Sequence, residues 1–182
     1  KYPIRLQYVG RLDKDSQGLL LLTNDGDLSN SIQKSVNNHE KEYRVRVNKP
    51  ITDEFLTQMA AGVPILDTVT KKCRLYKIDN YSFKIIITQG LNRQIRRMCE
   101  YFGYKVVNLK RLRVINIRLG NLRPGEYRHL TKEEETELRR LVERKEEVKT
   151  KRKEAQPDNK NEQNVVGNKR YVSWKRETES KN

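Results

Sequence analysis

The sequence predicts an α+β domain in which a mixed, mainly antiparallel sheet is flanked by helices. Residues 41–48 alternate between apolar and charged side chains, which is typical of a strand with one buried and one wet face. Residues 69–78 and 81–88 are predicted to form a hairpin about Asp79-Asn80. Segments with helical spacing of apolar residues lie between these strands, so we expect helices on the flanks of the sheet.

Near the N-terminus, two apolar strands are predicted to hold a polar loop between them. Residues 4–9 form the first strand, and the four leucines at 19–22 form a second, buried strand that is too short to span a membrane. The loop at 10–18 carries two carboxylates, Asp13 and Asp15. A polar loop between buried strands is a rigid mount for a reacting side chain. Most loop aspartates, however, only satisfy nearby backbone amides, so the residues alone leave both interpretations open.

Two helices are predicted from their end residues and apolar spacing. The first follows the tight turn at 25–27, has Asp27 placed as its N-cap, and carries apolar residues at helical spacing from Leu28 to Val36. The second covers residues 52–62, where a threonine can act as N-cap, two acids complement the helix dipole and a glycine ends the helix.

The most basic predicted helix lies between Asn92 and Gly103. Asn92 is placed to cap it, and apolar residues share one face. Arg93, Arg96 and Arg97 crowd its first turns, where positive charge opposes the helix dipole. A bound anion would explain these arginines, while a solvated basic face is the alternative.

The C-terminal part of the chain is predicted to change character near residue 145. A basic strand at 103–114 is followed by a last helix that begins at Thr131, with Glu134 completing a capping box. Beyond that helix, lysine, glutamate, asparagine and glutamine dominate and no apolar period survives. We therefore expect a folded domain at 1–145 and, at 146–182, a basic low-complexity tail that is disordered or ordered by a partner.

The charge of the chain predicts a polyanionic partner. Lysine and arginine number 39 against 24 acids, a net charge of +15 and a pI near 9.9. No long apolar run or amphipathic basic helix with aromatic anchors is found, so we expect nucleic acid rather than a membrane. Cys73 and Cys99 lack metal-type spacing and are predicted to be reduced thiols of a cytoplasmic protein. His39 and His129 are too few and too scattered for a metal site.

Three sequence blocks resemble the RNA pseudouridine synthases of the RsuA/RluF branch. The first is Arg11-Leu12-Asp13 followed by Ser16-x-Gly18 and the run at 19–26; the others are Asn92–Met98 and residues 103–114. The resemblance extends over roughly residues 5–142 and implies the catalytic fold of that family. Within the branch the chain resembles the RluF type, through residues 39–43, 49–55 and 62–66. Members carry an N-terminal S4-type RNA-binding domain, so we expect that module to be missing before Lys1.

The resemblance also implies roles for individual residues. Asp13 is the catalytic carboxylate beside the ribose, Tyr43 lies against the target base, and Arg96 pairs with Asp13. For Tyr43 a plain core position remains the alternative. Arg11 is the candidate to enter the stack vacated by a flipped base, and Leu109 to lie beneath the uracil. The expected RNA contacts are Arg11, Lys41, Asn92, Arg93, Arg97, Leu109 and Arg111.

The function implied is isomerisation of a specific uridine to pseudouridine in structured RNA. Large-subunit (23S) ribosomal RNA is the expected substrate, transfer RNA stays open as a second one, and we expect a monomer. The reaction requires no metal, nucleotide or redox cofactor. One alternative is a non-catalytic ribosomal RNA-binding module, which would not need the set of Asp13, Tyr43 and Arg96. Another is a glycosidase-like hydrolase that pairs Asp13 with Asp25 or Asp27, which the +15 charge disfavours.

Overall fold

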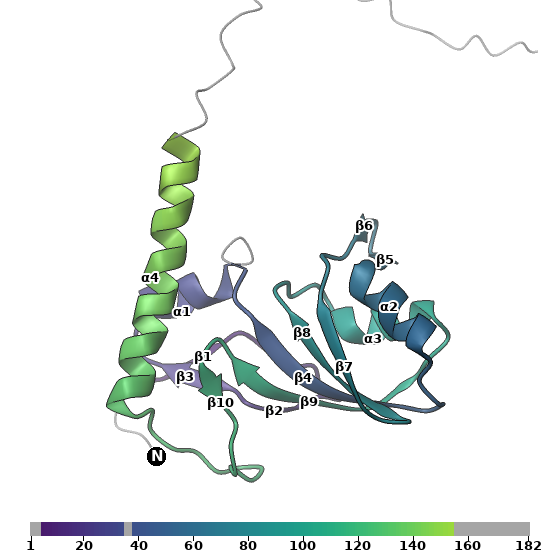
Figure 1. Ribbon diagram of the computed structural model, residues 1–182. Coiled ribbons are helices and arrows are strands. Elements are labelled where there is room, and N and C mark those ends of the chain that lie inside the picture. Colours follow the sequence, from purple (N-terminus) through teal and green to yellow (C-terminus); the bar gives the residue numbers. More distant parts are fainter. Residues whose placement is uncertain (1–4, 35–37, 155–182) are drawn as a thin grey trace, which may run out of the picture.

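The central feature of the computed structural model, which describes residues 5–34 and 38–154, is a six-stranded sheet (Figure 1). Its strand order is β10-β9-β4-β8-β7, and the short β2 pairs with β9 in parallel while the other pairs are antiparallel. The predicted α+β fold with a mixed, mainly antiparallel sheet is confirmed. The elements are β1 (Gln7–Val9), β2 (Gln17–Gly18), β3 (Leu21–Thr23), α1 (Gly26–Gln33), β4 (Lys41–Val47), α2 (Asp53–Ala61), β5 (Pro64–Ile65), β6 (Thr68–Val69), β7 (Arg74–Asp79), β8 (Ser82–Ile87), α3 (Gln94–Tyr101), β9 (Val106–Val114), β10 (Ile117–Arg118) and α4 (Lys132–Glu154).

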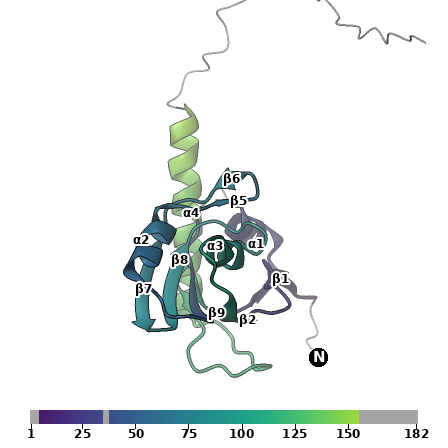
Figure 2. The same cartoon turned by 90° about the vertical axis from the view of Figure 1, so that its right-hand side faces the viewer.

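The larger hydrophobic core lies between the sheet and helices α2 and α3, which share one side of it (Figures 1 and 2). Val45, Phe83 and Ile85 point from the sheet toward Phe55 of α2 and Met98 of α3, and all five are 0–3% exposed. Burial on this scale is the main force that holds the two helices on the sheet. The alternation predicted for 41–48 is confirmed from Tyr43 to Val47, whereas Glu42, on the face predicted to be wet, is buried.

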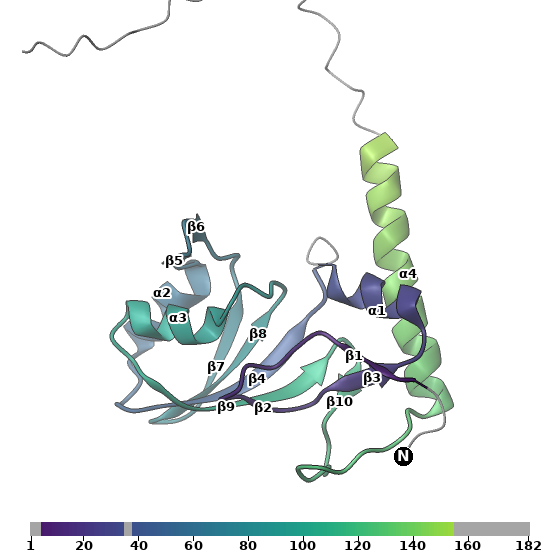
Figure 3. The same cartoon turned by 180° about the vertical axis from the view of Figure 1, so that it is seen from behind.

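A smaller core forms where β1, β3, α1 and α4 meet the end of β9 (Figure 3). Its buried members include one from each of these elements: Val9, Leu21, Ile32, Val114 and Leu138. Strands β1 and β3 pair only with each other. The loop after β1 therefore passes from this smaller core to the edge of the main sheet, where β2 joins β9.

The predicted leucine strand is only half buried. Leu19 and Leu21 are 6% and 8% exposed, whereas Leu20 and Leu22 are 42% and 54% exposed. The reason is that β3 belongs to a two-stranded ribbon with one open face, so only alternate residues reach the core.

The predicted hairpin is confirmed about its turn, but its first arm is shorter than expected. Strand β7 begins at Arg74 rather than at residue 69. The preceding segment Thr68–Val69 pairs instead with Pro64–Ile65 in a small separate hairpin. A local turn at Leu66 and Asp67, both at positive φ, draws these residues away from the main sheet.

Two predicted helix caps are wrong, and two are confirmed. Asp25, not Asp27, caps α1, accepting from the Leu28 amide at 2.9 Å. The residue before α3 is Arg93 in a left-handed conformation, not Asn92, and it makes no side-chain cap. The Thr52 cap of α2 and the Thr131–Glu134 capping box of α4 form as expected.

Helix α4 continues through residues 146–154, which composition assigned to the tail. In the first turns of α4, Leu138 and Val142 pack in the smaller core, and ion pairs such as Arg139–Glu135 at 3.0 Å and Arg140–Glu137 at 2.7 Å join neighbouring turns. The rest of the expected tail, 155–182, lies outside the described residues, as does Val36 of the first predicted helix. In the part of the chain that is described, no helix is both long and apolar enough to cross a membrane.

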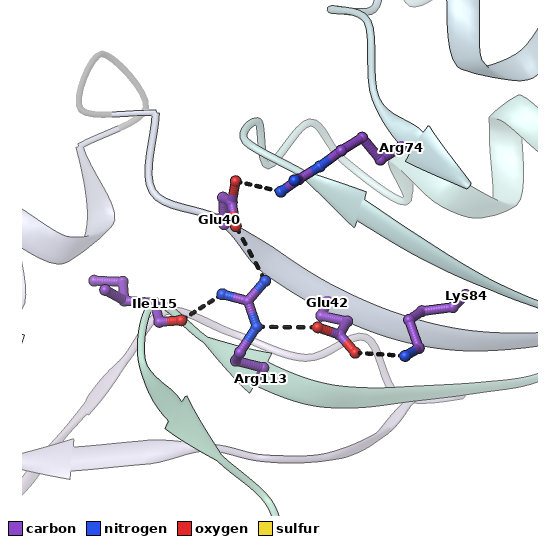
Figure 4. Close-up of polar contacts among 6 residues, drawn as sticks. All are labelled: Glu40, Glu42, Arg74, Lys84, Arg113 and Ile115. Carbon is purple, nitrogen blue, oxygen red and sulfur yellow. Dashed lines mark hydrogen bonds and ion pairs between the residues drawn. The ribbon is translucent and has the colours of Figure 1, made fainter. Parts of the chain in front are cut away.

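An ion-pair network joins residues of β4, β7, β8 and β9 with Glu40, which directly precedes β4 (Figure 4). Glu42 of β4, 7% exposed, accepts from Arg113 at 3.0 Å and lies 3.3 Å from Lys84. Arg113 also bonds Glu40 at 3.0 Å, and Glu40 bonds Arg74 at 2.6 Å. Burial raises the pKa of Glu42, but hydrogen bonds from Arg113 and Lys84 outweigh it, so the pKa is lowered overall. Glu42 is therefore a charged buried group that is fully paired.

Candidate active site

The loop that carries Asp13 is fastened to the sheet by the parallel β2–β9 pair. Gln17 and Gly18 lie opposite Lys110 and Arg111. Gly18 has a φ of +113°, and a Cβ atom there would lie 2.3 Å from the Arg111 carbonyl oxygen. A side chain at this position would push the two strands apart, so glycine is what allows the loop to lie against β9.

The side chain of Arg111 fastens the same loop a second time. Arg111 is 2% exposed. Its Nε donates to the Leu19 carbonyl at 2.7 Å, and its Nη1 donates to the Arg11 carbonyl at 3.3 Å. The Ser16 amide closes a turn by donating to the Asp13 carbonyl at 2.9 Å. The backbone is thus held on both sides of Asp13.

Tyr43 lies next to this arrangement, directly opposite Arg111 in the β4–β9 pair. It is 9% exposed and belongs to the larger core. Burial raises the pKa of Tyr43, the charge of Arg111 lowers it, and the carboxylate of Asp13 adds to the rise. The result is a pKa above the usual value, so the hydroxyl keeps its proton at neutral pH. Tyr43, Arg111 and Asp13 therefore share one electrostatic neighbourhood.

Arg96 does not form the ion pair with Asp13 that the resemblance implies. It is 7% exposed, and its Nη2 donates to the backbone carbonyl of Asp15 at 2.6 Å. Its Nη1 donates to the Val106 carbonyl at 3.3 Å. A buried guanidinium requires hydrogen-bond acceptors, and here backbone carbonyls accept its bonds in place of the Asp13 carboxylate. Arg96 therefore ties the loop to α3 and β9, as Arg111 does from the sheet.

The expected RNA contacts divide into surface and interior residues. Leu109 and Arg111 are interior, at 5% and 2% exposed, and Leu109 packs in the larger core opposite Val45. A direct phosphate contact is out of reach for Arg111 in this conformation, because its guanidinium is enclosed and already bonded to the loop. The contacts that reach solvent, wholly or in part, are Arg11, Lys41, Asn92, Arg93 and Arg97.

A cleft of about 260 Å³ borders the Asp15 side of the loop. Three cations line it, Arg93, Arg96 and Lys105, together with two carboxylates, Asp15 and Glu100. Arg93 and Asp15 face each other at 3.5 Å. The predicted catalytic aspartate and tyrosine are not among its lining residues. The cleft therefore lies beside the loop and not at the predicted reacting groups.

The structure thus places a loop aspartate beside a buried tyrosine, on a sheet that has helices on one side. Two buried arginines hold the backbone of that loop. The chain belongs to the RNA pseudouridylate synthase family, whose family model matches residues 1–101. It is 57% identical over 146 residues to the "Dual-specificity RNA pseudouridine synthase RluF" of Escherichia coli K12, covering 80% of this chain and 50% of that protein.

Other relatives agree with this assignment. The RluF of Salmonella typhi is 58% identical over 139 residues, covering 76% of this chain and 48% of the relative. The "Ribosomal small subunit pseudouridine synthase A" of Salmonella typhimurium is 39% identical over 133 residues, covering 71% of this chain and 58% of that protein. A solved structure described as "Crystal structure of pseudouridylate synthase" matches with a TM-score of 0.72 and 34% identity, covering 78% of this chain and 62% of that one. The resemblance to the RsuA/RluF branch is confirmed, and the chain spans about half the length of the RluF relatives.

Proposed function

We propose that this chain carries the catalytic site of an RNA pseudouridine synthase and isomerises a uridine in structured RNA. The observation that carries the proposal is the placement of Asp13 on a loop that Arg111 holds beside Tyr43. Membership in the family supports the reaction class. A carboxylate whose backbone is fixed on both sides needs little reorganisation when substrate arrives, which is what positioning catalysis requires.

The proposed reaction exchanges one bond for another at the ribose. The bond from C1′ to N1 breaks, the base turns, and a bond from C1′ to C5 forms. C5 loses its hydrogen and N1 gains a proton, so the product is an isomer. Asp13 either attacks the sugar as a nucleophile or removes a sugar proton, and both routes need the carboxylate at the ribose.

Tyr43 and Leu109 are proposed to hold the base. Both belong to the buried side of the sheet, on the neighbouring strands β4 and β9, and we propose that they form the floor on which the base lies. The raised pKa of Tyr43 keeps its ring neutral, so it can lie against a neutral uracil without placing a second negative charge near Asp13. The target must leave its stack to reach this floor, at a cost of a few kcal/mol, and exposed Arg11 is proposed to enter the vacated position.

The proposed substrate is large-subunit (23S) ribosomal RNA, with transfer RNA as a second candidate. The RluF relatives are named dual-specificity enzymes, which supports action on more than one RNA. The choice of 23S ribosomal RNA rests on the resemblance to the RluF type. The net charge of +15 suits either polyanion.

A glycosidase-like pairing of Asp13 with Asp25 is disfavoured by the contacts of Asp25. That carboxylate caps α1 through the Leu28 amide and lies 3.0 Å from Arg139. It is thus committed to helix α1 and to its contact with α4. No observation favours hydrolysis over isomerisation.

The proposal is tested by following loss of the C5 hydrogen. Ribosomal RNA from cells lacking the gene, prepared with tritium at C5 of uridine, is incubated with the full protein that contains this chain, and tritium release is measured. The wild type should release tritium, and Asp13→Asn should abolish release while RNA affinity stays within a few-fold.

Asp15→Asn is the matched control for that experiment. Its carboxylate makes only an exposed 3.5 Å contact with Arg93, and the bond from Arg96 goes to its backbone. Asp15→Asn should therefore release tritium at close to the wild-type rate. Release at the wild-type rate by Asp13→Asn, or a dead Asp15→Asn enzyme with an active Asp13→Asn, would overturn the assignment.

A further inference from the structure

The side of the sheet opposite α2 and α3, which we call the outer face, carries a row of positive charge. Arg44 lies between buried Tyr43 and Val45 in β4, so its side chain points to the outer face. Its partners across the two neighbouring strands are Lys84 of β8 and Lys110 of β9. Because paired residues share a face of the sheet, these three cations lie in one line.

The line of residues that contains these cations continues onto two more strands, where its members are neutral. Gln17 of β2 lies opposite Lys110, and Tyr76 of β7 lies opposite Lys84. Neighbouring strands are about 4.8 Å apart, so the cations of the row are direct neighbours. Like charges directly opposite one another destabilise a sheet. The row from Lys110 through Arg44 to Lys84 is therefore unfavourable for the folded protein by itself.

Carboxylates on the outer face neutralise only part of this row, at Lys84. Glu42 lies 3.3 Å from Lys84 but is shared with Arg113, which it bonds at 3.0 Å. Across the described residues, neither Arg44 nor Lys110 forms an ion pair with a carboxylate. Exposed Arg46, two residues along β4, adds to the same positive surface. The charges of Arg44 and Lys110 are thus left for a partner.

The position of the row also suits a partner that reaches the active site. Helices α2 and α3 lie on the other side, and no described helix covers the outer face of β4 and β8 (Figures 1 and 3). The row ends at Gln17, on the strand that directly follows the Asp13 loop. A chain of phosphates passing over the edge at β2 would connect the two sides of the sheet.

We propose that the outer face binds the phosphate backbone of RNA through Lys110, Arg44 and Lys84. Tyr76, 50% exposed at the end of the row, is placed to stack on an unpaired base. That this RNA is the substrate rests on the proposed function, whereas phosphate binding by the face does not. The contacts are to phosphate, so they add affinity without reading sequence.

The test compares two double variants of the full protein. Arg44→Gln/Lys110→Gln removes two charges of the row, and Arg123→Gln/Lys132→Gln removes two exposed cations from the loop before α4 and from its start. The affinity of each for a fluorescein-labelled 20-nucleotide oligouridylate is measured between 50 and 300 mM KCl. Loss of two phosphate contacts should reduce the slope of log affinity against log salt by about 1.4, and affinity at 100 mM roughly tenfold. The control should keep the wild-type slope.

Several outcomes would overturn the proposal. Equal losses in both variants would show an effect of net charge alone, and no loss in either would show that the face does not bind RNA. Polyglutamate that displaces the oligouridylate from the wild type as well as RNA does would assign the face to an acidic protein segment. A lower unfolding midpoint for the Arg44→Gln single variant would show that the cation serves the fold. Binding is measured without turnover, so an inactive wild type would refute only the proposed function.

Discussion

Arg111 and Leu19 are 92 residues apart in the sequence and are joined by a hydrogen bond of 2.7 Å from Nε to the Leu19 carbonyl. The same guanidinium reaches the Arg11 carbonyl, so one buried side chain holds the chain before and after Asp13. The geometry of the proposed catalytic loop therefore depends on a residue of the sheet rather than on the loop's own sequence.

Replacing Arg111 with lysine should separate charge from geometry. Lysine keeps the positive charge but cannot bond two carbonyls with a planar fork. We expect the free energy of unfolding to fall by about 2 kcal/mol, as for loss of a buried hydrogen bond to a charged group. Tritium release at saturating RNA should fall at least about tenfold. Arg118→Lys, an exposed change on β10, is the control, and full activity of Arg111→Lys would show that the clamp is not needed for turnover.

Arg96 is expected to tolerate lysine better than Arg111 does. The shorter of the two carbonyl bonds of Arg96, 2.6 Å to Asp15, is one that an ammonium can also make, so that lysine would lose mainly the 3.3 Å bond to Val106. Arg96→Ala should lose about 2–3 kcal/mol of stability in urea unfolding, and Arg96→Lys should recover most of it together with tritium release. An Arg96→Lys protein that is stable but inactive would instead support a direct role of Arg96 at the Asp13 carboxylate when RNA is bound.

Gly18→Ala should disturb the attachment of the loop to β9. The added methyl group would lie 2.3 Å from the Arg111 carbonyl oxygen, at a φ of +113° that alanine rarely adopts. We expect a loss of roughly 2–4 kcal/mol in unfolding free energy and a matching loss of tritium release. Gly90→Ala is the control, because a Cβ there meets nothing within 4 Å. Equal stability of the two variants would mean that β2 is not rigidly paired.

Glu42 should make stability depend on pH in the acidic range. Its pKa in the folded protein lies below the unfolded value of 4.5, so its stabilising effect is complete above 4.5 and is lost as pH falls through the folded pKa. Urea unfolding of the wild type and Glu42→Gln should differ by about 2 kcal/mol at pH 7. The difference should shrink below pH 4. A difference that stays constant down to pH 3 would show that packing, not the carboxylate charge, accounts for the effect.

The alternating strand and the Asp13 loop could be recognised in the sequence because their signals are local. The period of two in β4 places Tyr43 inside, and the apolar runs on either side of the loop predict its mount. Strand β2 could not be found this way, since two residues carry no period. The sequence predicts Asp27 as the cap of α1, but both aspartates of the turn have the right chemistry, and only the observed backbone selects Asp25.

The partners of the buried arginines could not be read from the sequence. Backbone carbonyls accept the bonds of Arg96 and Arg111, and every residue offers one, so no residue type marks the acceptor. A signal for the burial of Arg111 did exist. It follows Leu109 by two residues, and a strand period places both on the same buried face.

The attachment of the Asp13 loop through Arg111 also sets the order in which the protein can mature on the ribosome. Translation at 5–20 residues per second puts roughly 5–18 s between synthesis of Leu19 and of its partner 92 residues later. During that interval the N-terminal segment has neither its guanidinium clamp nor the strand beside which β2 lies. Closing so long a loop is entropically expensive and slow compared with forming a helix or hairpin. The segment that carries the proposed chemistry is thus made before β9 and completed only after β9 has emerged, so nascent chains that stop before residue 111 should be inert.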